Sequence, residues 1–293
     1  MASGCSASLL FLLGLAYAAS VYSAPIKETV DITWGGERAK FLNNGHLLTL
    51  SEDKESGSGF QSKKLYLYGE LSMQMKLVPG DSAGTVTTFY MATRVGALNE
   101  IDFEFLGNLS GQPYTVHTNI YINGTGNREQ QFSLWFDPSA DFHNYTIVWN
   151  RRTVGWYVDG KAIRLFPNLN AYGIPYLAPV PMRMFSSIWN GDDWATMGGK
   201  VKTNWNNAPF TALYRNFNAV GCVISDDGAS SCSNSNTRSI RRDRSKVSLK
   251  TRRQVRFFRK RYMIYNYCSD NWRFPAGMPP ECKVKFHFIR GRG

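Results

Sequence analysis

From about residue 30 to residue 217, short stretches in which apolar and polar residues alternate are separated by turn-forming residues. Every second residue of a stretch tends to be apolar, and Gly, Pro, Asn and Asp recur in between, as in half-buried strands. The expected strands are Leu65–Met75, Thr85–Met91, Ile101–Phe105, Val116–Ile122, Tyr145–Trp149 and Val154–Val158. No long segment repeats with the helical period of about 3.6 residues. This pattern predicts an all-β sandwich or jelly roll, not a barrel of βαβ units.

The N-terminus has the composition of a secretion signal. Residues 1–24 carry no charged side chain, residues 8–19 form an apolar run, and small residues follow at Ser20, Ser23 and Ala24. Such a run is too short to cross a bilayer and matches the core of a signal peptide. We therefore predict a signal peptide at 1–23, with a buried N-terminal helix as the alternative. No later segment is apolar enough to span a membrane, so a soluble, secreted protein without a membrane partner is expected.

Cysteine usage agrees with an oxidising compartment. Cys5 would leave with the signal peptide, and four cysteines remain in the last quarter of the chain: Cys222, Cys232, Cys268 and Cys282. They predict two disulfides with three possible pairings, among which we favour nearest neighbours, 222–232 and 268–282. A zinc site is the alternative, but no C-x-x-C spacing occurs and the nearby His287 lies beyond the cluster. No metal and no cofactor are expected.

The last quarter of the chain also differs in charge. A stretch rich in Ser, Asn and Gly (225–237) leads into a basic segment, 238–261, with twelve Lys or Arg and one acid, a local +11 against +12 for the whole chain. Residues 252–263 could form a helix. We predict a strand-rich catalytic domain at 24–217 and, at 218–293, a C-terminal extension that is pinned by two disulfides and contains a short helix. The basic segment is either a solvated surface or a polyanion-binding site, and secretion argues against nucleic acid.

Three acids alternate along one expected strand, Glu100-Ile101-Asp102-Phe103-Glu104. Successive side chains of a strand point to opposite faces, so the acids share one face and the apolar residues share the other. The large apolar groups belong in the core, which leaves the acids on the opposite surface. Aligned carboxylates raise one another's pKa values and weaken a strand, so the arrangement indicates a function.

Glycoside cleavage with retention of configuration uses such a set. It needs an ionised carboxylate as nucleophile and a carboxylic acid as proton donor, about 5–5.5 Å apart. The Cα atoms of Glu100 and Glu104 would lie about 13 Å apart at roughly 3.3 Å per residue, a gap that two side chains leaning toward a sugar can close. Asp102 could hydrogen-bond the nucleophile and separate the pKa values of the two glutamates. A calcium site and an exposed acidic edge are the alternatives.

The stretch Glu100-Ile101-Asp102-Phe103-Glu104-Phe105-Leu106-Gly107-Asn108 resembles the signature of the xyloglucan endotransglucosylase/hydrolases of glycoside hydrolase family 16. The resemblance extends over nearly the whole chain after the signal peptide. Similar blocks follow in order: Asn127-Arg128-Glu129-Gln130-Gln131-Phe132, Leu134-Trp135-Phe136-Asp137-Pro138, Asp192-Asp193-Trp194-Ala195-Thr196, Ala208-Pro209-Phe210, Tyr262-Met263-Ile264-Tyr265-Asn266-Tyr267-Cys268 and Pro279-Pro280-Glu281-Cys282. One block could arise by chance, but this ordered set identifies the family.

The resemblance implies a curved, concanavalin-like jelly roll whose concave face holds a glucan. It implies Glu100 as nucleophile, Glu104 as acid/base and Asp102 as their helper. It also implies sugar contacts from His117, Thr118, Asn119, Asn127, Arg128, Glu129, Asp193, Trp194, Gly198 and Arg273. A core tryptophan is the alternative for Trp194. The family usually carries a polar pair such as His-Asp before the first glutamate, where this chain has Leu98-Asn99, so we expect an altered nucleophile or loop.

The function implied by the resemblance is transglycosylation. A monomeric enzyme of the plant cell wall would cleave a xyloglucan donor and rejoin it to a xyloglucan acceptor. An endo-hydrolase and a non-catalytic glucan-binding protein are the alternatives, and the short segment 168–184 favours transfer over hydrolysis. If the basic segment 238–261 binds a polyanion and is not simply a solvated surface, the polyanion expected for a wall enzyme is acidic wall polysaccharide. Sequons occur at Asn108, Asn123 and Asn144, and the family places a glycan at the position of Asn108.

Overall fold

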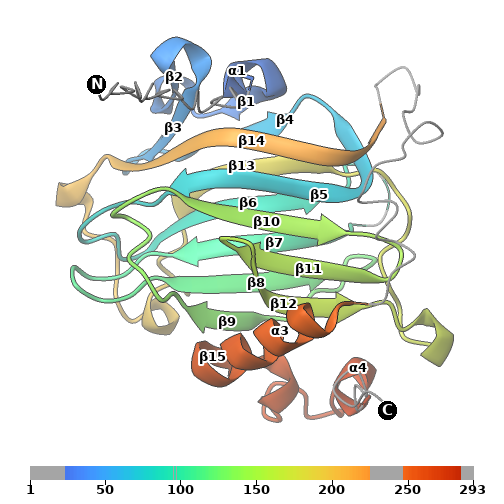
Figure 1. The fold of residues 1–293 in the computed structure, drawn as a ribbon. Coiled ribbons are helices and arrows are strands. Elements are labelled where there is room, and N and C mark those ends of the chain that lie inside the picture. Colours follow the sequence, from blue (N-terminus) through green and yellow to red (C-terminus); the bar gives the residue numbers. More distant parts are fainter. Residues whose placement is uncertain (1–23, 95, 97, 225–246, 285–293) are drawn as a thin grey trace, which may run out of the picture.

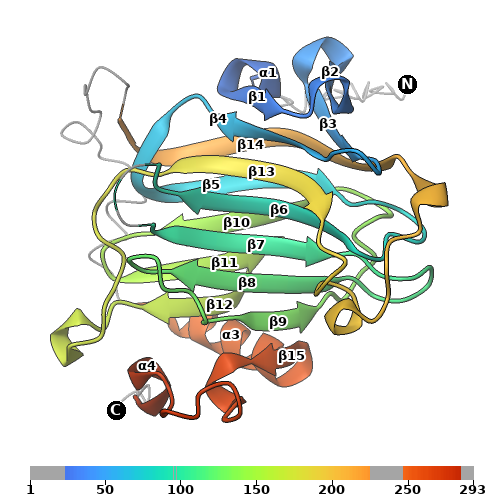
Figure 2. The same cartoon turned by 180° about the vertical axis from the view of Figure 1, so that it is seen from behind.

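The computed structural model describes residues 24–94, 96, 98–224 and 247–284, which form two stacked antiparallel sheets (Figure 1, Figure 2). The eight-stranded sheet has the order β1 (Val30–Trp34), β4 (Ser58–Ser62), β13 (Arg183–Asn190), β6 (Thr85–Ala92), β7 (Glu100–Leu106), β8 (Thr115–Tyr121), β9 (Gln130–Ser133) and β15 (Met263–Asn266). The seven-stranded sheet has the order β12 (Lys161–Pro167), β11 (Thr153–Val158), β10 (His143–Trp149), β5 (Leu65–Lys76), β14 (Phe210–Ile224), β3 (Leu47–Glu52) and β2 (Ala39–Leu42). The predicted all-β sandwich is confirmed.

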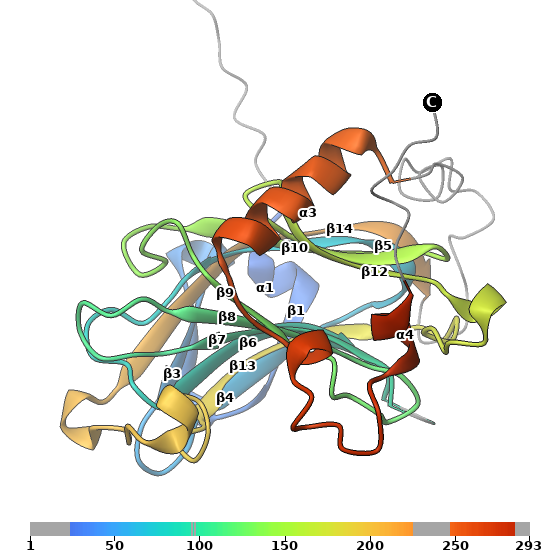
Figure 3. The ribbon, with the colours of Figure 1, turned by 90° about the horizontal axis from the view of Figure 1, so that it is seen from below.

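Helices occupy a small part of the described chain. The α-helices are α1 (Ile26–Thr29), α3 (Leu249–Arg261) and α4 (Pro280–Lys283). The short 3-10 helices are η1 (Gly36–Arg38), η2 (Asn43–Gly45), η3 (Asn170–Tyr172), η4 (Met197–Gly199), η5 (Trp205–Asn207) and η6 (Tyr267–Ser269). Helix α3 packs along β12, on the outer side of the seven-stranded sheet (Figure 3). None of the helices in the described ranges is long and apolar enough to span a membrane.

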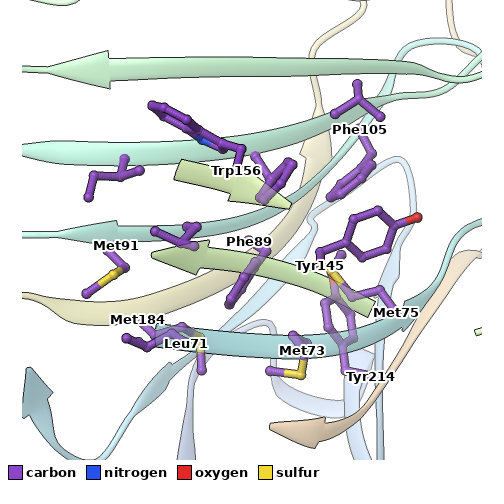
Figure 4. Packing of buried hydrophobic residues seen from close by; sticks show 14 of the residues in the cluster. Leu71, Met73, Met75, Phe89, Met91, Phe105, Tyr145, Trp156, Met184 and Tyr214 are labelled. Carbon is purple, nitrogen blue, oxygen red and sulfur yellow. The ribbon is translucent and has the colours of Figure 1, made fainter. Parts of the chain in front are cut away.

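The core lies between the sheets and is built from the alternate residues that each strand turns inward. On β7, Phe103 and Phe105 are fully buried, and the ring of Phe105 lies 4.5 Å from that of Tyr145 on β10 of the other sheet. Figure 4 shows these rings close to the methionines of β5. Burial of each phenylalanine side chain stabilises the fold by roughly 1.5–3 kcal/mol. The inward-facing phenylalanines of β7 therefore determine which face of the strand points outward.

The predicted strands are all present, with ends displaced by at most two residues. The predicted helix, residues 252–263, is α3, but it begins earlier, at Leu249. The hydroxyl of Ser248 accepts a hydrogen bond of 3.1 Å from the N–H of Thr251 and caps the first turn. The helix ends at Arg261, where the chain turns into β15.

The extension contributes a strand that sequence analysis missed. β15 pairs antiparallel with β9 and so extends the sheet that carries the three acids. A disulfide joins Cys268 to Cys282, as predicted. Cys222 is also disulfide-bonded, and its expected partner, Cys232, lies outside the described residues.

Two further expectations stay predictions. The signal peptide, residues 1–23, lies outside the described residues, as do residues 238–246 of the basic segment. Strand β14 runs without interruption across position 217, where sequence analysis divides the chain. The extension therefore begins within a strand of the seven-stranded sheet.

Candidate active site

The three acids lie on a central strand of the eight-stranded sheet. β7 pairs with β6 on one side and with β8 on the other, so the acids are not on an exposed edge. The alternation predicted for this strand is confirmed, because Ile101, Phe103 and Phe105 are fully buried in the core. On the opposite face, which we call the acidic face, the Glu104 side chain is 23 % exposed and Asp102 is buried. Solvent and ligand can therefore reach the acids from this side only.

Glu100 and Asp102 share a side-chain hydrogen bond. Burial raises the pKa of Asp102 well above its usual range, and the charges of Glu100 and Glu104 add to the effect. Burial also raises the pKa of Glu100, but the hydrogen bond from Asp102 opposes this. The proton of the pair therefore belongs on Asp102, which donates it to an ionised Glu100 carboxylate.

Glu104 has a different environment. Burial, and then the charges of Glu100 and Glu129, raise its pKa to about 7. Its Oε2 lies 3.6 Å from Nε2 of His117. Burial, and then Arg164 and Arg273, lower the pKa of His117 to about 4, so this ring is neutral beside Glu104. The result is a carboxylic acid that keeps its proton in mildly acidic solution.

Gln131 orients the ring of His117. Its side-chain nitrogen lies 3.1 Å from Nδ1 of His117 and donates a hydrogen bond to it. Nδ1 is then the acceptor, so the single proton of the neutral ring lies on Nε2, the nitrogen that faces Glu104. Glu104, His117 and Gln131 are cross-strand neighbours on β7, β8 and β9.

The other sheet supports these strands from behind. Trp156 on β11 donates a hydrogen bond of 2.8 Å to the main-chain carbonyl of Asp102. The guanidinium of Arg164 on β12 lies 4.5 Å from the centre of the Trp156 ring and donates to the carbonyl of Thr118, 2.6 Å away. Both side chains are buried. They tie β7 and β8 to the seven-stranded sheet behind the acids.

The structure brings four of the predicted sugar contacts together at one end of the acidic face. Asn119 lies opposite Asp102 and donates to Glu129, 3.4 Å away. Arg273, from the extension, donates to Glu129 and to Asn127, each at 2.8 Å. These residues form a polar cluster that joins the extension to the acidic face.

Two of the predicted contacts lie elsewhere. The side chain of Thr118 points into the core, where it donates to the carbonyl of Gln130 and accepts from Arg164, 2.8 Å away. The guanidinium of Arg128 is bonded to Glu281, 2.7 Å away, and to the carbonyl of Thr125. The structure therefore does not bring these two side chains to the acidic face.

The remaining predicted contacts lie on the loop after β13. The ring centre of Trp194 lies 5.8 Å from that of His117, and its residue is 37 % exposed, which separates it from a core tryptophan. Asp193 is 94 % exposed and forms an ion pair with Lys202 at 3.0 Å. Gly198 has φ +68°, in the left-handed region where glycine is favoured.

Leu98 and Asn99, where this chain departs from the family pattern, form hydrogen bonds with neighbouring segments. Asn99 is buried, its N–H donates to Thr93 at 3.0 Å, and its side-chain oxygen accepts from the N–H of Asn123 at 3.2 Å. The carbonyl of Leu98 accepts from the N–H of Gly124, 2.7 Å away. This pair therefore ties the start of β7 to the turn after β8. The predicted glycan site, Asn108, lies in the loop just after β7 and is half-buried.

Sequence reasoning missed three residues that the fold brings to the acidic face. Tyr90 pairs with Asp102 across β6 and β7, Gln131 contacts His117, and Trp189 lies 6.1 Å from Trp194 between ring centres. Tyr90 occupies an acid-facing position of a predicted strand, but its neighbours depend on strand register, which no local pattern reveals. Within the described ranges, no group of three or more His, Cys, Asp or Glu is arranged to hold a metal ion.

Residues 26–207 match the family model described as glycosyl hydrolases family 16, and residues 232–282 match that of the xyloglucan endo-transglycosylase (XET) C-terminus. The chain belongs to glycosyl hydrolases family 16. Among similar proteins of this family, xyloglucan endotransglucosylase protein 8 of Diospyros kaki is 53 % identical over 280 residues, 94 % of this chain and 95 % of the relative. Xyloglucan endotransglucosylase/hydrolase protein 22 of Arabidopsis thaliana is 53 % identical over 277 residues, 94 % of this chain and 97 % of the relative.

Solved structures share the family 16 fold at lower identity. A Bacillus licheniformis beta-glucanase has a TM-score of 0.54 at 23 % identity, covering 68 % of this chain and 94 % of its own. The apo Crh5 transglycosylase has a TM-score of 0.56 at 24 % identity, covering 71 % of this chain and 82 % of its own. Both similarities concern the fold alone and agree with the jelly-roll sandwich.

Proposed function

We propose that this chain is a retaining endo-transglycosylase that cleaves the β-1,4-glucan backbone of xyloglucan and rejoins it to another xyloglucan chain. Family membership and the names of relatives at 53 % identity support the substrate and the reaction. The observation that carries the proposal is which of the three acids on β7 are protonated and which is ionised. A protonated Asp102 beside Glu100 and a separately protonated Glu104 supply the nucleophile and acid that a retaining mechanism requires.

In the first step the Glu100 carboxylate attacks the anomeric carbon of the donor. Glu104 gives its proton to the glycosidic oxygen as the bond to the leaving chain breaks, which leaves a glycosyl ester on Glu100. In the second step Glu104, now a carboxylate, takes the proton of the acceptor 4-hydroxyl as that oxygen attacks the same carbon. The ester bond breaks, Glu100 is released as a carboxylate, and Glu104 is protonated again.

The assay that tests this function uses xyloglucan and a labelled xyloglucan oligosaccharide. Incorporation of label into polymer without new reducing ends is the expected result. New reducing ends without incorporation would replace transfer by hydrolysis, since water would then resolve the same intermediate. Binding of xyloglucan without either product would leave a non-catalytic glucan-binding protein.

The assigned nucleophile is tested separately. Glu100→Ala removes the attacking carboxylate, so we expect transfer to fall at least a thousandfold while the melting temperature changes little. Full activity of this variant would overturn the mechanism. The matched control is Glu70→Ala, which removes a glutamate from β5 of the seven-stranded sheet, away from the acidic face.

We also propose that the protein is a secreted, monomeric glycoprotein of the plant apoplast, with residues 1–23 removed and a glycan on Asn108. The composition of residues 1–24 and the sequon at Asn108 support this. Mass spectrometry of protein recovered from the wall tests both modifications, because it gives the mature N-terminus and the glycan mass. Size-exclusion chromatography with light scattering tests the monomer.

The basic segment, in our proposal, holds acidic wall polysaccharide. Seven cations lie on α3, and six of them are exposed there: Lys250, Arg253, Arg256, Arg259, Lys260 and Arg261. Salt elution from isolated walls tests the proposal with Arg252, Arg253 and Arg256 replaced by Gln. Elution at lower salt is expected, and unchanged retention would exclude the segment as an anchor.

A further inference from the structure

The turn between β8 and β9, two neighbouring strands of the sheet in Figure 2, has Asn123 and Gly124 at its tip. Ile122 and Thr125 exchange main-chain hydrogen bonds of 3.0 and 3.1 Å across the tip. Asn123 has φ +52° and Gly124 has φ +78°, so both lie in the left-handed region, as a two-residue type I′ turn requires. Asn followed by Gly is the pair that this turn favours. The sequence therefore builds a tight turn with Asn123 at its outer end.

Asn123, Gly124 and Thr125 form a sequon, and all three residues are exposed. The main chain of the turn is anchored to the start of β7. The N–H of Asn123 donates to the side-chain oxygen of Asn99, and the N–H of Gly124 donates to the carbonyl of Leu98. The side-chain amide of Asn123, by contrast, has no hydrogen-bond partner among the residues that the structure describes. A sugar on its nitrogen would therefore break no contact of the fold.

The sequon at Asn144 lies in a different setting. Asn144 is half-buried, and its side-chain nitrogen donates to the hydroxyl of Thr146, 3.1 Å away. Thr146 is buried, and both residues belong to β10, which pairs with β5 on one side and with β11 on the other. The two polar groups of this sequon are thus bonded to each other within a sheet, so it is less accessible than the sequon at Asn123.

The sequon at Asn108 is intermediate. Asn108 is half-buried, its side-chain nitrogen donates to the carbonyl of Pro113 at 3.0 Å, and its side-chain oxygen accepts from the N–H of Leu109 at 2.9 Å. The amide keeps a second N–H for a sugar, so a glycan at Asn108 is compatible with these bonds. Among the three sequons, that of Asn123 is the most exposed.

The turn stands at the corner between the acidic face and the extension. Tyr121, at the end of β8, lies opposite Glu100, and a Cβ atom added to Gly126 would lie 2.7 Å from the Tyr121 ring. Just after the turn, Asn127 accepts a hydrogen bond of 2.8 Å from Arg273 of the extension. A glycan on the tip would therefore leave the molecule at the border of the acidic face. Such a bulky, hydrophilic group keeps the surface around it in solvent.

We propose that Asn123 carries an N-linked glycan, in addition to the one proposed for Asn108. The side-chain nitrogen of Asn123 forms a bond to the anomeric carbon of a lipid-linked oligosaccharide, the lipid diphosphate leaves, and one amide proton is released to water. The modification depends on the secretion proposed above, because the oligosaccharide is transferred in the secretory pathway. It does not depend on the proposed transglycosylation.

The test is peptide mapping by mass spectrometry of the full chain, residues 1–293, secreted from plant cells. The peptide that contains Asn123 should carry a glycan in most molecules. Peptide N-glycosidase in heavy-oxygen water should then leave a labelled aspartate at position 123. An unmodified Asn123 in protein that has lost residues 1–23 would overturn the proposal. An unlabelled aspartate would also overturn it, because an exposed Asn-Gly pair loses ammonia without a glycan. Retention of residues 1–23 with every sequon unmodified would contradict secretion itself, and this glycan with it.

Variants locate the modified residue. Thr125→Ala removes the hydroxyl of the sequon but keeps Asn123 and Gly124, whose turn Asn123→Gln would strain at φ +52°. We expect Thr125→Ala to lose the glycan of this peptide and Thr125→Ser, which keeps the sequon, to retain it. The matched control is Ser110→Ala, which removes the sequon of Asn108 and should leave the modification of Asn123 unchanged. A glycan that persists on this peptide in Thr125→Ala would show that Asn123 is not its site. Thermal melting confirms that each variant is folded.

Discussion

The indole N–H of Trp156 donates a hydrogen bond of 2.8 Å to the main-chain carbonyl of Asp102. Trp156 belongs to the seven-stranded sheet and Asp102 to the eight-stranded sheet, so this bond crosses the core. It holds the centre of β7 at the residue that lies between the two glutamates. The position of the acids therefore depends on a side chain that no ligand can touch.

Trp156→Phe should lower both stability and turnover. The replacement keeps an aromatic ring but leaves the Asp102 carbonyl buried without its donor, at a cost of about 1–3 kcal/mol. We expect a lower melting temperature, together with a fall in kcat that exceeds any change in KM, because the ring does not reach the acidic face. Thermal melting and steady-state transfer kinetics measure the two effects.

Trp149→Phe provides the control for this variant. Trp149 is also fully buried, but its indole nitrogen has no hydrogen-bond partner in the described part of the chain. Both variants replace a fully buried indole by a smaller ring, and only Trp156→Phe breaks a hydrogen bond to β7. Equal loss of kcat in the two would show that ring volume, not the hydrogen bond, positions the acids.

The rate of transfer should fall as the pH rises through about 7. The pKa of Glu104 is raised to about 7, so the protonated acid that the first step consumes is abundant below this pH and is lost above it. A pH profile of kcat/KM should show a basic limb near 7 with a tenfold fall per pH unit.

His117→Gln tests whether this limb belongs to Glu104. The pKa of His117 is lowered to about 4, so the ring is already neutral where the limb appears. The variant should lose activity but keep a basic limb. Disappearance of the limb would assign the titration to the histidine.

Glu52 should make the protein less stable as the pH rises. Both carboxylate oxygens of Glu52 lack partners in the described ranges, and burial, with the charges of Asp192 and Asp53, raises its pKa from 4.5 to about 8. Between about pH 4.5 and 8 the folded protein keeps the Glu52 proton, whereas the unfolded chain has released it. The free energy of unfolding therefore decreases as the pH rises through this range. Glu52→Gln cannot ionise and should be more stable than the parent at pH 8 by a few kcal/mol.

The measurement compares denaturant unfolding of Glu52→Gln and the parent at pH 5 and pH 8. The raised pKa values of Asp102 and Glu104 act in the same direction and remain in both proteins, so the difference between the two proteins isolates Glu52. A stability gap that does not widen from pH 5 to pH 8 would show that Glu52 is ionised in the folded protein.

Loss of the disulfide between Cys268 and Cys282 should release the end of the extension. The bond closes a loop with a sequence separation of 14, and a loop of about 15 residues contributes roughly 3 kcal/mol. The double variant Cys268→Ser/Cys282→Ser should melt at lower temperature and bind xyloglucan more weakly, because Arg273, a predicted sugar contact, lies within that loop and contacts Glu129. An unchanged KM for xyloglucan with a lowered melting temperature would show that the loop contributes to stability and not to binding.

The sequence predicted the strands and the face of the acids because both depend on local alternation. Glu100, Asp102 and Glu104 were found in this way, and the buried residues between them agree. Gln131, Tyr90 and Trp156 were not found, because their contacts to His117 and Asp102 depend on strand register and on how the two sheets face each other. Thr118 was misplaced by treating three consecutive residues as one contact block, although alternation already turns its side chain away from Asn119.

β15 has a consequence for how the chain can be divided. Without it, β9 would present a row of unpaired N–H and C=O groups at the border of the eight-stranded sheet, ready to pair with another molecule. A truncated protein that ends before residue 247 would thus be prone to self-association through that border. The extension therefore protects the edge of the sheet that carries the three acids.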